Sequence, residues 1–494
     1  MLRGLRKMNS KPKKIKLYNT LSKHIEELKP IKDSLFRIYS CGPTIYNFAH
    51  IGNLRYFVFV DVLRKTLKHF GYRIKHVMNL TDVDDKTIKS SREKGMPLRE
   101  YTDMFAKYFF EDLKMLNIEL VEVYPRATET IPEIIAFIEK IIENKHAYVV
   151  NGNVYFDIST FKDYGKLANL DLSTLKENAQ GRLDDEYDKE DPRDFALWKA
   201  YVSDDGDVFW ESPWGKGRPG WHIECSVMSS KYLTDIFENG AINLKLFETI
   251  DIHTGAVDLI FPHHTNEIAQ TESVVNKPFV KYWVHCEHLF VDGKKMSKSL
   301  GNFYTLRDIL NKGYSPRAFR YLCLSSHYRQ QLNFTLKTMD AAENTIKRFD
   351  NFVFVLNVIK NRSKEKSTRE EFAKKIEEFK DSFDEFLSEN LDTPKALTKV
   401  FEFISYVNKT KDLSSAEAKL TLEALRYFDS VLSVFDFEIK EDSLSEETMN
   451  LILKREMARK NKHWELADSI REQLRKQGIE LADTPLGTVW KRTK

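Results

Sequence analysis

Two short motifs that stand far apart in the chain could together bind a nucleotide. His50-Ile51-Gly52-Asn53 lies where a helix is expected to begin, and Lys295-Met296-Ser297-Lys298-Ser299 lies in a loop flanked by glycines. An imidazole at a helix N-terminus can donate hydrogen bonds to a phosphate, and a glycine lets the backbone approach the adenine. Lysines on a loop can close over a pyrophosphate and stabilise the charge that develops when the α-phosphate is attacked.

Each motif has a plainer interpretation when it is taken alone. A single histidine is more often structural than catalytic, and a lysine-rich loop is more often a solvated surface. The two motifs in this order favour adenylation chemistry, in which most of the rate comes from positioning and electrostatics.

A second set of side chains has the chemistry of a metal site. His263 and Glu267 are four residues apart on a predicted helix, so both project from one face. Cys41 and Cys225 each end a predicted strand, and strand ends of a parallel sheet converge on the ligand crevice. Two thiolates, an imidazole and a carboxylate suit tetrahedral zinc. The spacing leaves His264 and the group His285-Cys286-x-His288 open as rivals.

The elements expected around these residues form a parallel α/β sheet, because strand, loop, helix and strand follow one another. Strands of this sheet are predicted at residues 35–40, 72–80, 210–225 and 250–260, and helices beside it at 54–69 and 263–275. The predicted helix at 131–144 and the predicted strand at 154–158 belong to an insertion. The region beyond residue 332 has the amphipathic pattern of long helices up to about residue 438, followed by two short helices and an irregular tail.

Length and composition fit a chain of several domains. With 494 residues, three or four domains are expected. The sequence has no apolar run long enough to span a membrane, and its basic first 16 residues lack the apolar core of a secretory signal, so a cytoplasmic protein is expected. The net charge is only +3, but residues 453–494 hold 11 Lys or Arg against 6 Asp or Glu. This excess favours a phosphate-backbone partner, although a solvated helix face would look the same.

The two nucleotide motifs resemble the signatures of the class I aminoacyl-tRNA synthetases, His-Ile-Gly-His and Lys-Met-Ser-Lys-Ser. The second is matched in full, whereas Asn53 replaces the last histidine of the first and cannot carry charge. Within that class, segments along nearly the whole chain resemble the cysteinyl-tRNA synthetases. They are Cys41-Gly-Pro-Thr-Ile-Tyr46, Asn79-Leu-Thr-Asp-Val-Asp-Asp-Lys86, Pro125-Arg-Ala-Thr128, Asp194-Phe-Ala-Leu-Trp-Lys199, Ser212-Pro-Trp-Gly-Lys-Gly-Arg-Pro-Gly-Trp-His-Ile-Glu-Cys225, Phe261-Pro-His-His-Thr-Asn-Glu-Ile-Ala-Gln270 and Asp483-Thr-Pro-Leu-Gly-Thr-Val-Trp490.

This resemblance assigns roles to individual residues. It implies that one zinc ion is held by Cys41, Cys225, His263 and Glu267, and that the thiol of cysteine joins it, which separates cysteine from serine without an editing domain. It implies a substrate pocket with Gly42, Thr81, Trp221 and Asp258. The implied catalytic residues are His50, Gly52, Asn53, Lys295 and Lys298. The implied ATP contacts are Pro43, Thr44, His50, Gly52, Asn53, Lys295, Met296, Ser297, Lys298 and Ser299.

The implied reaction is the activation of L-cysteine with ATP and Mg²⁺, followed by transfer to tRNA(Cys) by a monomer. The expected fold is a Rossmann-like core with a connective insertion, a helical bundle and a small C-terminal domain. Its expected divisions are residues 1–125 and 196–290 for the catalytic core, 126–195 for the insertion, 291–340 for the lysine loop and stem-contact region, 341–440 for the bundle and 441–494 for an anticodon-binding module. Residues 233–247 are an extra segment, expected to form a surface loop or a helical turn.

Two other functions remain open at this point. A cysteine ligase that acts on an amino sugar would share the catalytic half but would have no use for the C-terminal module. A non-catalytic tRNA-binding paralogue would be expected to lose the metal ligands or the lysine loop, and both are intact.

Overall fold

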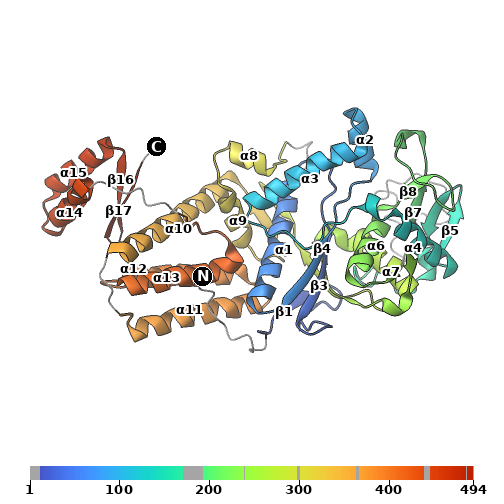
Figure 1. Ribbon diagram of the computed structural model, residues 1–494, viewed down its shortest axis with the longest axis horizontal. Helices are drawn as coiled ribbons and strands as arrows, with labels where there is room; N and C mark the ends of the chain where they lie inside the picture. Colours follow the sequence, from blue (N-terminus) through green and yellow to red (C-terminus); the bar gives the residue numbers. More distant parts are fainter. Residues whose placement is uncertain are drawn as a thin grey trace. The chain divides into compact units, whose positions relative to one another are not determined.

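The chain forms two compact units, which are drawn in Figure 1. The first unit comprises residues 1–336 and 388–391, and the second comprises residues 337–387 and 392–494. The computed structural model describes residues 12–170, 193–238, 240–296, 301–362, 367–438, 446–484 and 487–492. Ser297, Lys298 and Ser299 therefore lie outside the described residues, as does most of the acidic stretch before Asp194.

The first unit is built on a four-stranded sheet in which every neighbouring pair is parallel. The strand order is β12-β11-β3-β4, with β3 at Leu35–Ser40, β4 at Arg73–Met78, β11 at Ile250–Ala256 and β12 at Val280–Cys286. Strands β3, β11 and β12 are almost continuously buried, as expected of a parallel sheet covered on both faces, whereas only the second half of β4 is buried. The carboxyl ends of its strands are where such sheets place ligands.

Helix α1, Ile51–His69, connects β3 to β4 and carries the first motif. It begins three residues before the predicted start, because His50 is its N-cap. Residues of α1 are buried on nearly every side of the helix, so its sequence lacks the amphipathic pattern that would have indicated where the first turn begins. The other helices of this unit are α2 Asp85–Glu93, α3 Leu98–Met115, α4 Ile131–Glu143, α6 Trp221–Leu233, α7 Thr265–Val275, α8 Leu306–Asn311 and α9 Pro316–Leu324.

The insertion contains its own antiparallel sheet. Its strands are β5 Ala147–Val150, β6 Asn153–Phe156, β7 Phe195–Ala200 and β8 Gly217–Pro219, in that order. The prediction of a core strand over residues 210–225 is wrong, because β8 belongs to this sheet and α6 begins at Trp221. Only residues 217–220 and 223–225 of this stretch are buried, and short buried runs of that kind do not distinguish a strand from a helix.

Small pieces of sheet complete the first unit. They are the hairpin of β1 Lys16–Asn19 with β2 His24–Glu27, the hairpin of β9 Phe237–Glu238 with β10 Ala241–Ile242, and the sheet of β14 Lys294–Lys295, β13 Leu289–Val291 and β15 Leu332–Phe334. The extra segment at residues 233–247 holds a β-hairpin, which was not predicted, and a short 3-10 turn at Leu244–Leu246, which agrees with the predicted helical turn.

The second unit is helical, as predicted, except at its end. Its elements are α10 Leu336–Arg362, α11 Glu370–Ser388, α12 Thr393–Lys409, α13 Ser415–Leu432, α14 Glu446–Lys460, α15 Trp464–Lys476, β16 Ile479–Thr484 and β17 Gly487–Arg492. The predicted irregular tail is instead an antiparallel hairpin of β16 and β17. Trp490 of that hairpin packs with Phe354 of α10 in one hydrophobic cluster.

Among the described residues, no helix has the length and apolar character needed to cross a membrane.

Candidate active site and metal cluster

The four residues proposed as metal ligands lie together in the first unit and are all buried. One donor atom from each of Cys41, Cys225, His263 and Glu267 lies within 4.8 Å of the others. His263 Nε2 is 3.1 Å and Cys41 Sγ is 3.8 Å from Glu267 Oε1. Zinc bonds of about 2.0–2.3 Å at tetrahedral angles separate ligand atoms by about 3.3–3.8 Å. The donor types, the burial and the spacing therefore fit a zinc ion.

Three elements bring these ligands together. Cys41 directly follows β3, as predicted, at the carboxyl edge of the sheet. Cys225 lies in the second turn of α6, so the expectation that it ends a strand is wrong, although its proximity to Cys41 is as predicted. His263 lies in the π-helical turn Ile260–His264, and Glu267 lies in the first turn of α7, which follows directly.

Further histidines hold the ligands in place. His222 Nδ1 and His263 Nδ1 are 2.8 Å apart, which leaves His263 Nε2 directed toward Glu267. His253 Nε2 is 2.8 Å from Glu267 Oε2 and thus fixes the oxygen that His263 does not contact. Contacts of this kind behind metal ligands set their orientation and strengthen metal binding.

The electrostatics of the cluster favour ionised donors. Burial alone raises the pKa of Glu267, but His253 and His263 together lower it to about 2. A hydrogen bond with Cys41 and the nearby His263 lower the pKa of Cys225 to about 6. Burial and the neighbouring Cys225 raise the pKa of Cys41. The pair of thiols therefore releases its first proton at Cys225, and a bound cation would favour release of the second.

A rival set of donors shares two of these residues. Cys41 and Glu267 also group with His253 and His264, again within 4.8 Å. The ring of His264 packs directly against Gly255 of β11. A Cβ at position 255 would stand 2.3 Å from this ring, so only glycine leaves the space that the ring occupies. His264 Nδ1 is 2.8 Å from His285 Nε2, just as His263 Nδ1 is 2.8 Å from His222 Nδ1, so each set contains a histidine held by a second histidine.

Sequence reasoning assigned no role to His222 or His253. His222 stands three residues before Cys225, and His253 belongs to the buried strand β11, but neither position indicates by itself which ligand the ring contacts. The remaining rival, Cys286, is buried at the end of β12 and its pKa is raised to about 12 by burial.

His50 caps the helix that carries the first motif. Its Nδ1 accepts a hydrogen bond from the backbone N–H of Asn53 at 3.2 Å. The proton of the neutral ring is therefore on Nε2, from which it can be donated. Burial lowers the pKa of His50 to about 4, although Asp258 raises it in part, so the ring is neutral at pH 7. The side chain of Asn53 is exposed.

Met296 of the second motif lies against the first motif. A Cβ added to Gly52 would be 2.7 Å from Met296 Cε, so the methionine side chain touches the start of α1. On the far side of the loop, Ile51 N donates to Tyr304 O at 2.9 Å. Asn302 donates to Lys295 O at 3.2 Å. Lys295 itself is exposed.

Two residues expected in the substrate pocket, Gly42 and Thr81, lie at the loop that follows β3. Gly42 lies so close to Asn79 that a Cβ would be 1.7 Å from the carbonyl oxygen of that residue, and its N–H donates to Asn79 Oδ1 at 2.8 Å. Thr81 is buried, and its N–H donates to Pro43 O at 3.1 Å. Thr44 and Thr81 form a parallel bridge.

Trp221 and Asp258 are the two exposed members of the predicted pocket. Trp221 is 40% exposed and its ring lies 4.2 Å from that of His263. Asp258 is exposed and close enough to His50 to influence its pKa. The predicted residues thus link the metal cluster to the start of α1.

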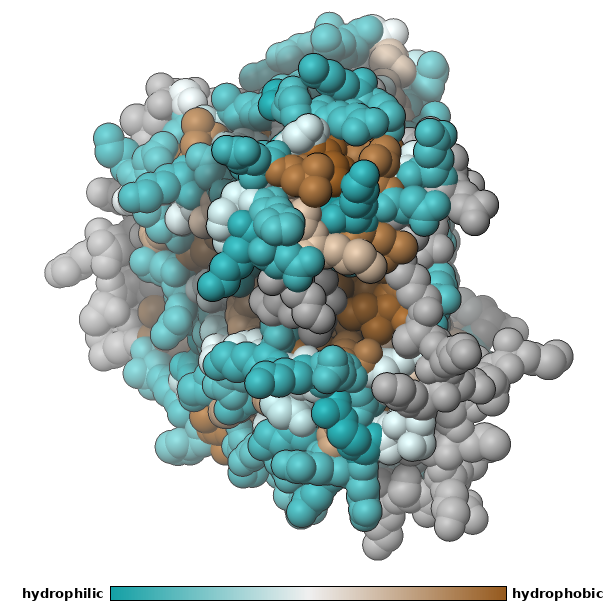
Figure 2. All heavy atoms as spheres, turned by 90° about the vertical axis from the view of Figure 1, so that its left-hand side faces the viewer, coloured by the Kyte–Doolittle hydropathy of each residue, from teal (hydrophilic) through white to brown (hydrophobic). Residues whose placement is uncertain are grey.

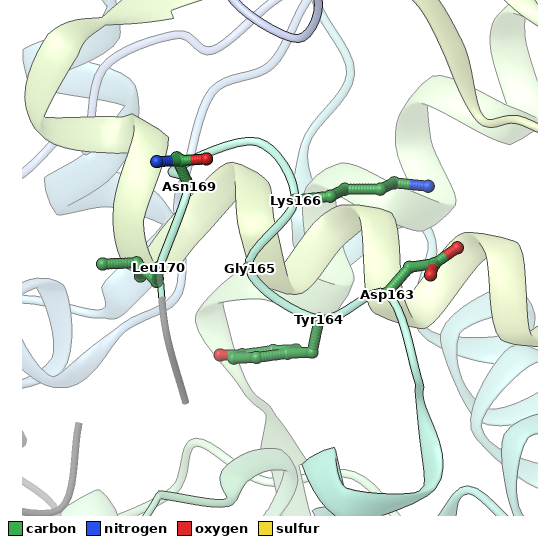
Figure 3. A pocket seen from close by; sticks show the side chains of 6 residues that line it. All are labelled: Asp163, Tyr164, Gly165, Lys166, Asn169 and Leu170. Atoms are coloured by element: carbon green, nitrogen blue, oxygen red, sulfur yellow. The ribbon is translucent and has the colours of Figure 1, made fainter. Parts of the chain in front are cut away.

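A separate hollow of about 340 Å³ lies at the turn of the insertion shown in Figure 3. It is lined by Asp163, Tyr164, Gly165, Lys166, Asn169 and Leu170. Tyr164 donates to Asn266 Oδ1 at 2.6 Å, and Lys166 forms an ion pair with Glu272. This turn therefore holds the insertion against α7, the helix that carries Glu267.

Comparisons with known proteins agree with this geometry. Residues 27–344 match the family model of the tRNA synthetases class I (C) catalytic domain, and residues 382–436 match the DALR domain. A cysteine–tRNA ligase of Brachyspira hyodysenteriae is 48% identical over 97% of this chain and 100% of its own length. The chain belongs to the class I cysteine–tRNA ligase family.

Other known proteins also match this chain over most of their own length. The cysteine–tRNA ligase of Protochlamydia amoebophila is 43% identical over 97% of this chain and 98% of its own length. A structure of Mycobacterium tuberculosis methionyl-tRNA synthetase with methionyl-adenylate has a TM-score of 0.57 at 14% identity, covering 81% of this chain and 92% of that one. A putative arginyl-tRNA synthetase of Campylobacter jejuni has a TM-score of 0.55 at 14% identity, covering 83% of this chain and 94% of that one. These two structures show the fold, a class I synthetase fold as predicted.

Proposed function

We propose that this chain is a cysteine–tRNA ligase that activates L-cysteine with ATP and Mg²⁺ and transfers it to the 3′ end of tRNA(Cys). The observation that carries the proposal is the buried set Cys41, Cys225, His263 and Glu267, which lies in the same unit as the paired nucleotide motifs. A thiol-binding metal beside an adenylation site is what selective activation of cysteine requires.

The chain's own residues would select the amino acid at this cluster. Bound zinc would supply a soft Lewis acid that favours sulfur over the hydroxyl of serine. Trp221 lies against His263 at the exposed side of the cluster, where it can pack against the side chain of the substrate. Asp258 would hold the ammonium group, and Thr81 with Gly42 would contact the backbone of the amino acid.

The nucleotide would be positioned by the two motifs. His50 can donate Nε2–H to a phosphate oxygen, because its Nδ1 accepts from Asn53. Gly52 and Met296 would contact the adenosine, together with Pro43 and Thr44. Lys295, with Lys298, Ser297 and Ser299 outside the described residues, would stabilise the leaving pyrophosphate.

Two alternatives fit the chain less well. An amino-sugar ligase has no use for the second unit, whose residues 382–436 match the DALR domain. A non-catalytic paralogue would have no need for four intact ligands. We retain the expected domain divisions, with residues 341–440 as the tRNA-binding bundle and 441–494 as the anticodon-binding module, and we propose a cytoplasmic monomer.

Within the described part of the C-terminal module, Trp464 offers an exposed ring for an unpaired base. Trp464 at the start of α15 is 57% exposed, whereas Trp490 is 6% exposed. The surface in Figure 2, seen from the side where Figure 1 draws α14 and α15, is mostly hydrophilic with a few hydrophobic patches. Exposed apolar side chains of these two helices are Leu453, Met457, Trp464 and Leu466.

Trp464→Ala is expected to raise the KM for tRNA about tenfold or more, because stacking on an aromatic ring contributes about 1–3 kcal/mol per base. ATP–pyrophosphate exchange with cysteine should be unchanged. Steady-state charging of tRNA(Cys) measures the first effect and exchange measures the second. Trp490→Phe is the matched control, since this ring fills a core and its replacement should lower the melting temperature without weakening tRNA binding. Unchanged charging by the Trp464 variant would count against this surface as an RNA contact.

A further inference from the structure

Arg55 is a buried arginine of α1 whose guanidinium donates hydrogen bonds to two different loops. The residue is 2% exposed and lies about one helical turn beyond His50. Its Nη1 donates to the carbonyl oxygens of Glu287, at 2.9 Å, and His288. Its Nη2 donates to the carbonyl oxygens of His327, at 3.3 Å, and Gln330. All four acceptors are backbone atoms, so the contacts fix the path of the chain.

The two loops that Arg55 binds are joined to each other. Glu287 N donates to Tyr328 O at 2.8 Å, and Leu332 N donates to His288 O at 3.1 Å. One loop leads directly into β13 and the other into β15, and these two strands pair in parallel. Arg55 therefore holds the base of the small sheet β14-β13-β15 to the helix of the first motif.

The same small sheet carries the beginning of the lysine motif. Its strand β14 contains Lys295, which pairs with Phe290 of β13. Met296 follows directly, and its side chain touches Gly52 of α1. The contacts thus form a closed path from α1 through Arg55 to Lys295 and back to α1 through Met296.

We infer that Arg55 is a positioning residue for adenylation, which sets the position of Lys295 relative to His50. This inference rests on the proposed function. Arginine suits the role because its planar guanidinium carries five N–H donors in a fixed fork, enough for four carbonyls. A lysine has three donors on one nitrogen and cannot bind all four carbonyls at once.

Arg55→Lys is expected to lower kcat for cysteine-dependent ATP–pyrophosphate exchange about 10- to 100-fold, because a displacement of about 1 Å at reacting groups can cost about 100-fold. The zinc content and the affinity for cysteine, measured by calorimetry on the zinc-loaded protein, should not change. A general loss of folding would lower both kcat and cysteine binding, so it would not produce this result.

Arg320→Lys is the matched control. Arg320 is also fully buried, and it holds α9 to α1 through Asp61 Oδ2 at 2.6 Å and to the end of α3 through Leu116 O at 3.0 Å. It should lose thermal stability comparably while keeping exchange. Arg55→Met, which preserves the buried aliphatic stem, gives a second variant for the same measurement should Arg55→Lys not fold.

The outcomes separate the inference from the proposed function. Slow exchange by the Arg55 variants, with normal exchange by Arg320→Lys, supports the positioning role. Exchange by a folded Arg55 variant within twofold of the wild type overturns it, and so does an equal loss in Arg320→Lys. Absence of exchange in the wild-type chain would instead overturn the proposed function, and with it the inference that depends on it.

Discussion

Replacing Cys225 with serine is expected to remove both the bound zinc and the activation of cysteine. Loss of a group that merely orients a ligand already weakens metal binding about 10- to 100-fold, so loss of a ligand should cost at least that. Cys225 is the thiol whose pKa is lowered, to about 6, by the hydrogen bond with Cys41 and by His263, so it is ionised at pH 7. Elemental analysis should show well under one zinc per chain, and cysteine-dependent exchange should fall at least about 100-fold.

Cys286→Ser is the matched control for this experiment. Cys286 is equally buried, but its donor atom is not grouped with the four ligands among the described residues. This variant should keep zinc and activity. A Cys225→Ser protein that retains a full zinc complement, while Cys41→Ser loses it, would shift the assignment to the rival set with His253 and His264.

Replacing His50 with serine is expected to slow exchange about 100- to 1,000-fold, the usual cost of removing one preorganised donor to a developing charge. Serine is a favourable N-cap, so α1 should remain as stable as in the wild type. His50→Ala should be as inactive and should also lose about 1 kcal/mol of stability, because the cap itself is lost. Exchange kinetics and thermal unfolding of both variants separate the two roles of the residue.

The lowered pKa of His50 adds an expected pH dependence to this prediction. Its pKa is lowered to about 4 by burial, below the value near 6.5 of the unfolded chain. Stability linked to this ring is therefore complete above pH 6.5 and is lost as pH falls toward 4. Between pH 7 and 8 the ring stays neutral, so it should contribute no inflection to the exchange rate. Near-normal exchange by the serine variant would reduce His50 to a helix cap.

Much of the active site could be predicted because its residues lie in short, chemically distinctive motifs. The i, i+4 spacing of His263 and Glu267 defines one helix face, and Cys41 follows an obvious buried strand. The position of Cys225 could not be derived in the same way. Residues 221–233 are buried on several sides, and such a segment shows no periodicity that separates helix from strand.

Contacts between segments that are distant in the sequence could not be predicted either. Nothing in the spacing of His222 or His253 indicates that one ring lies behind His263 and the other behind Glu267. Arg55 looks like any arginine on a helix until its four carbonyl partners are seen. The C-terminal hairpin was missed because its two strands are joined by Thr-Pro-Leu-Gly, whose proline and glycine suggest an irregular tail.

The most direct test of the central claim is ATP–pyrophosphate exchange with cysteine and with serine, before and after removal of zinc. The account predicts exchange that requires cysteine, rejects serine and fails when the metal is removed, with recovery on addition of zinc. Absence of cysteine-dependent exchange in the zinc-loaded chain would contradict the adenylation chemistry. Undiminished, cysteine-selective exchange after complete loss of zinc would contradict the role of Cys41, Cys225, His263 and Glu267 in choosing the amino acid.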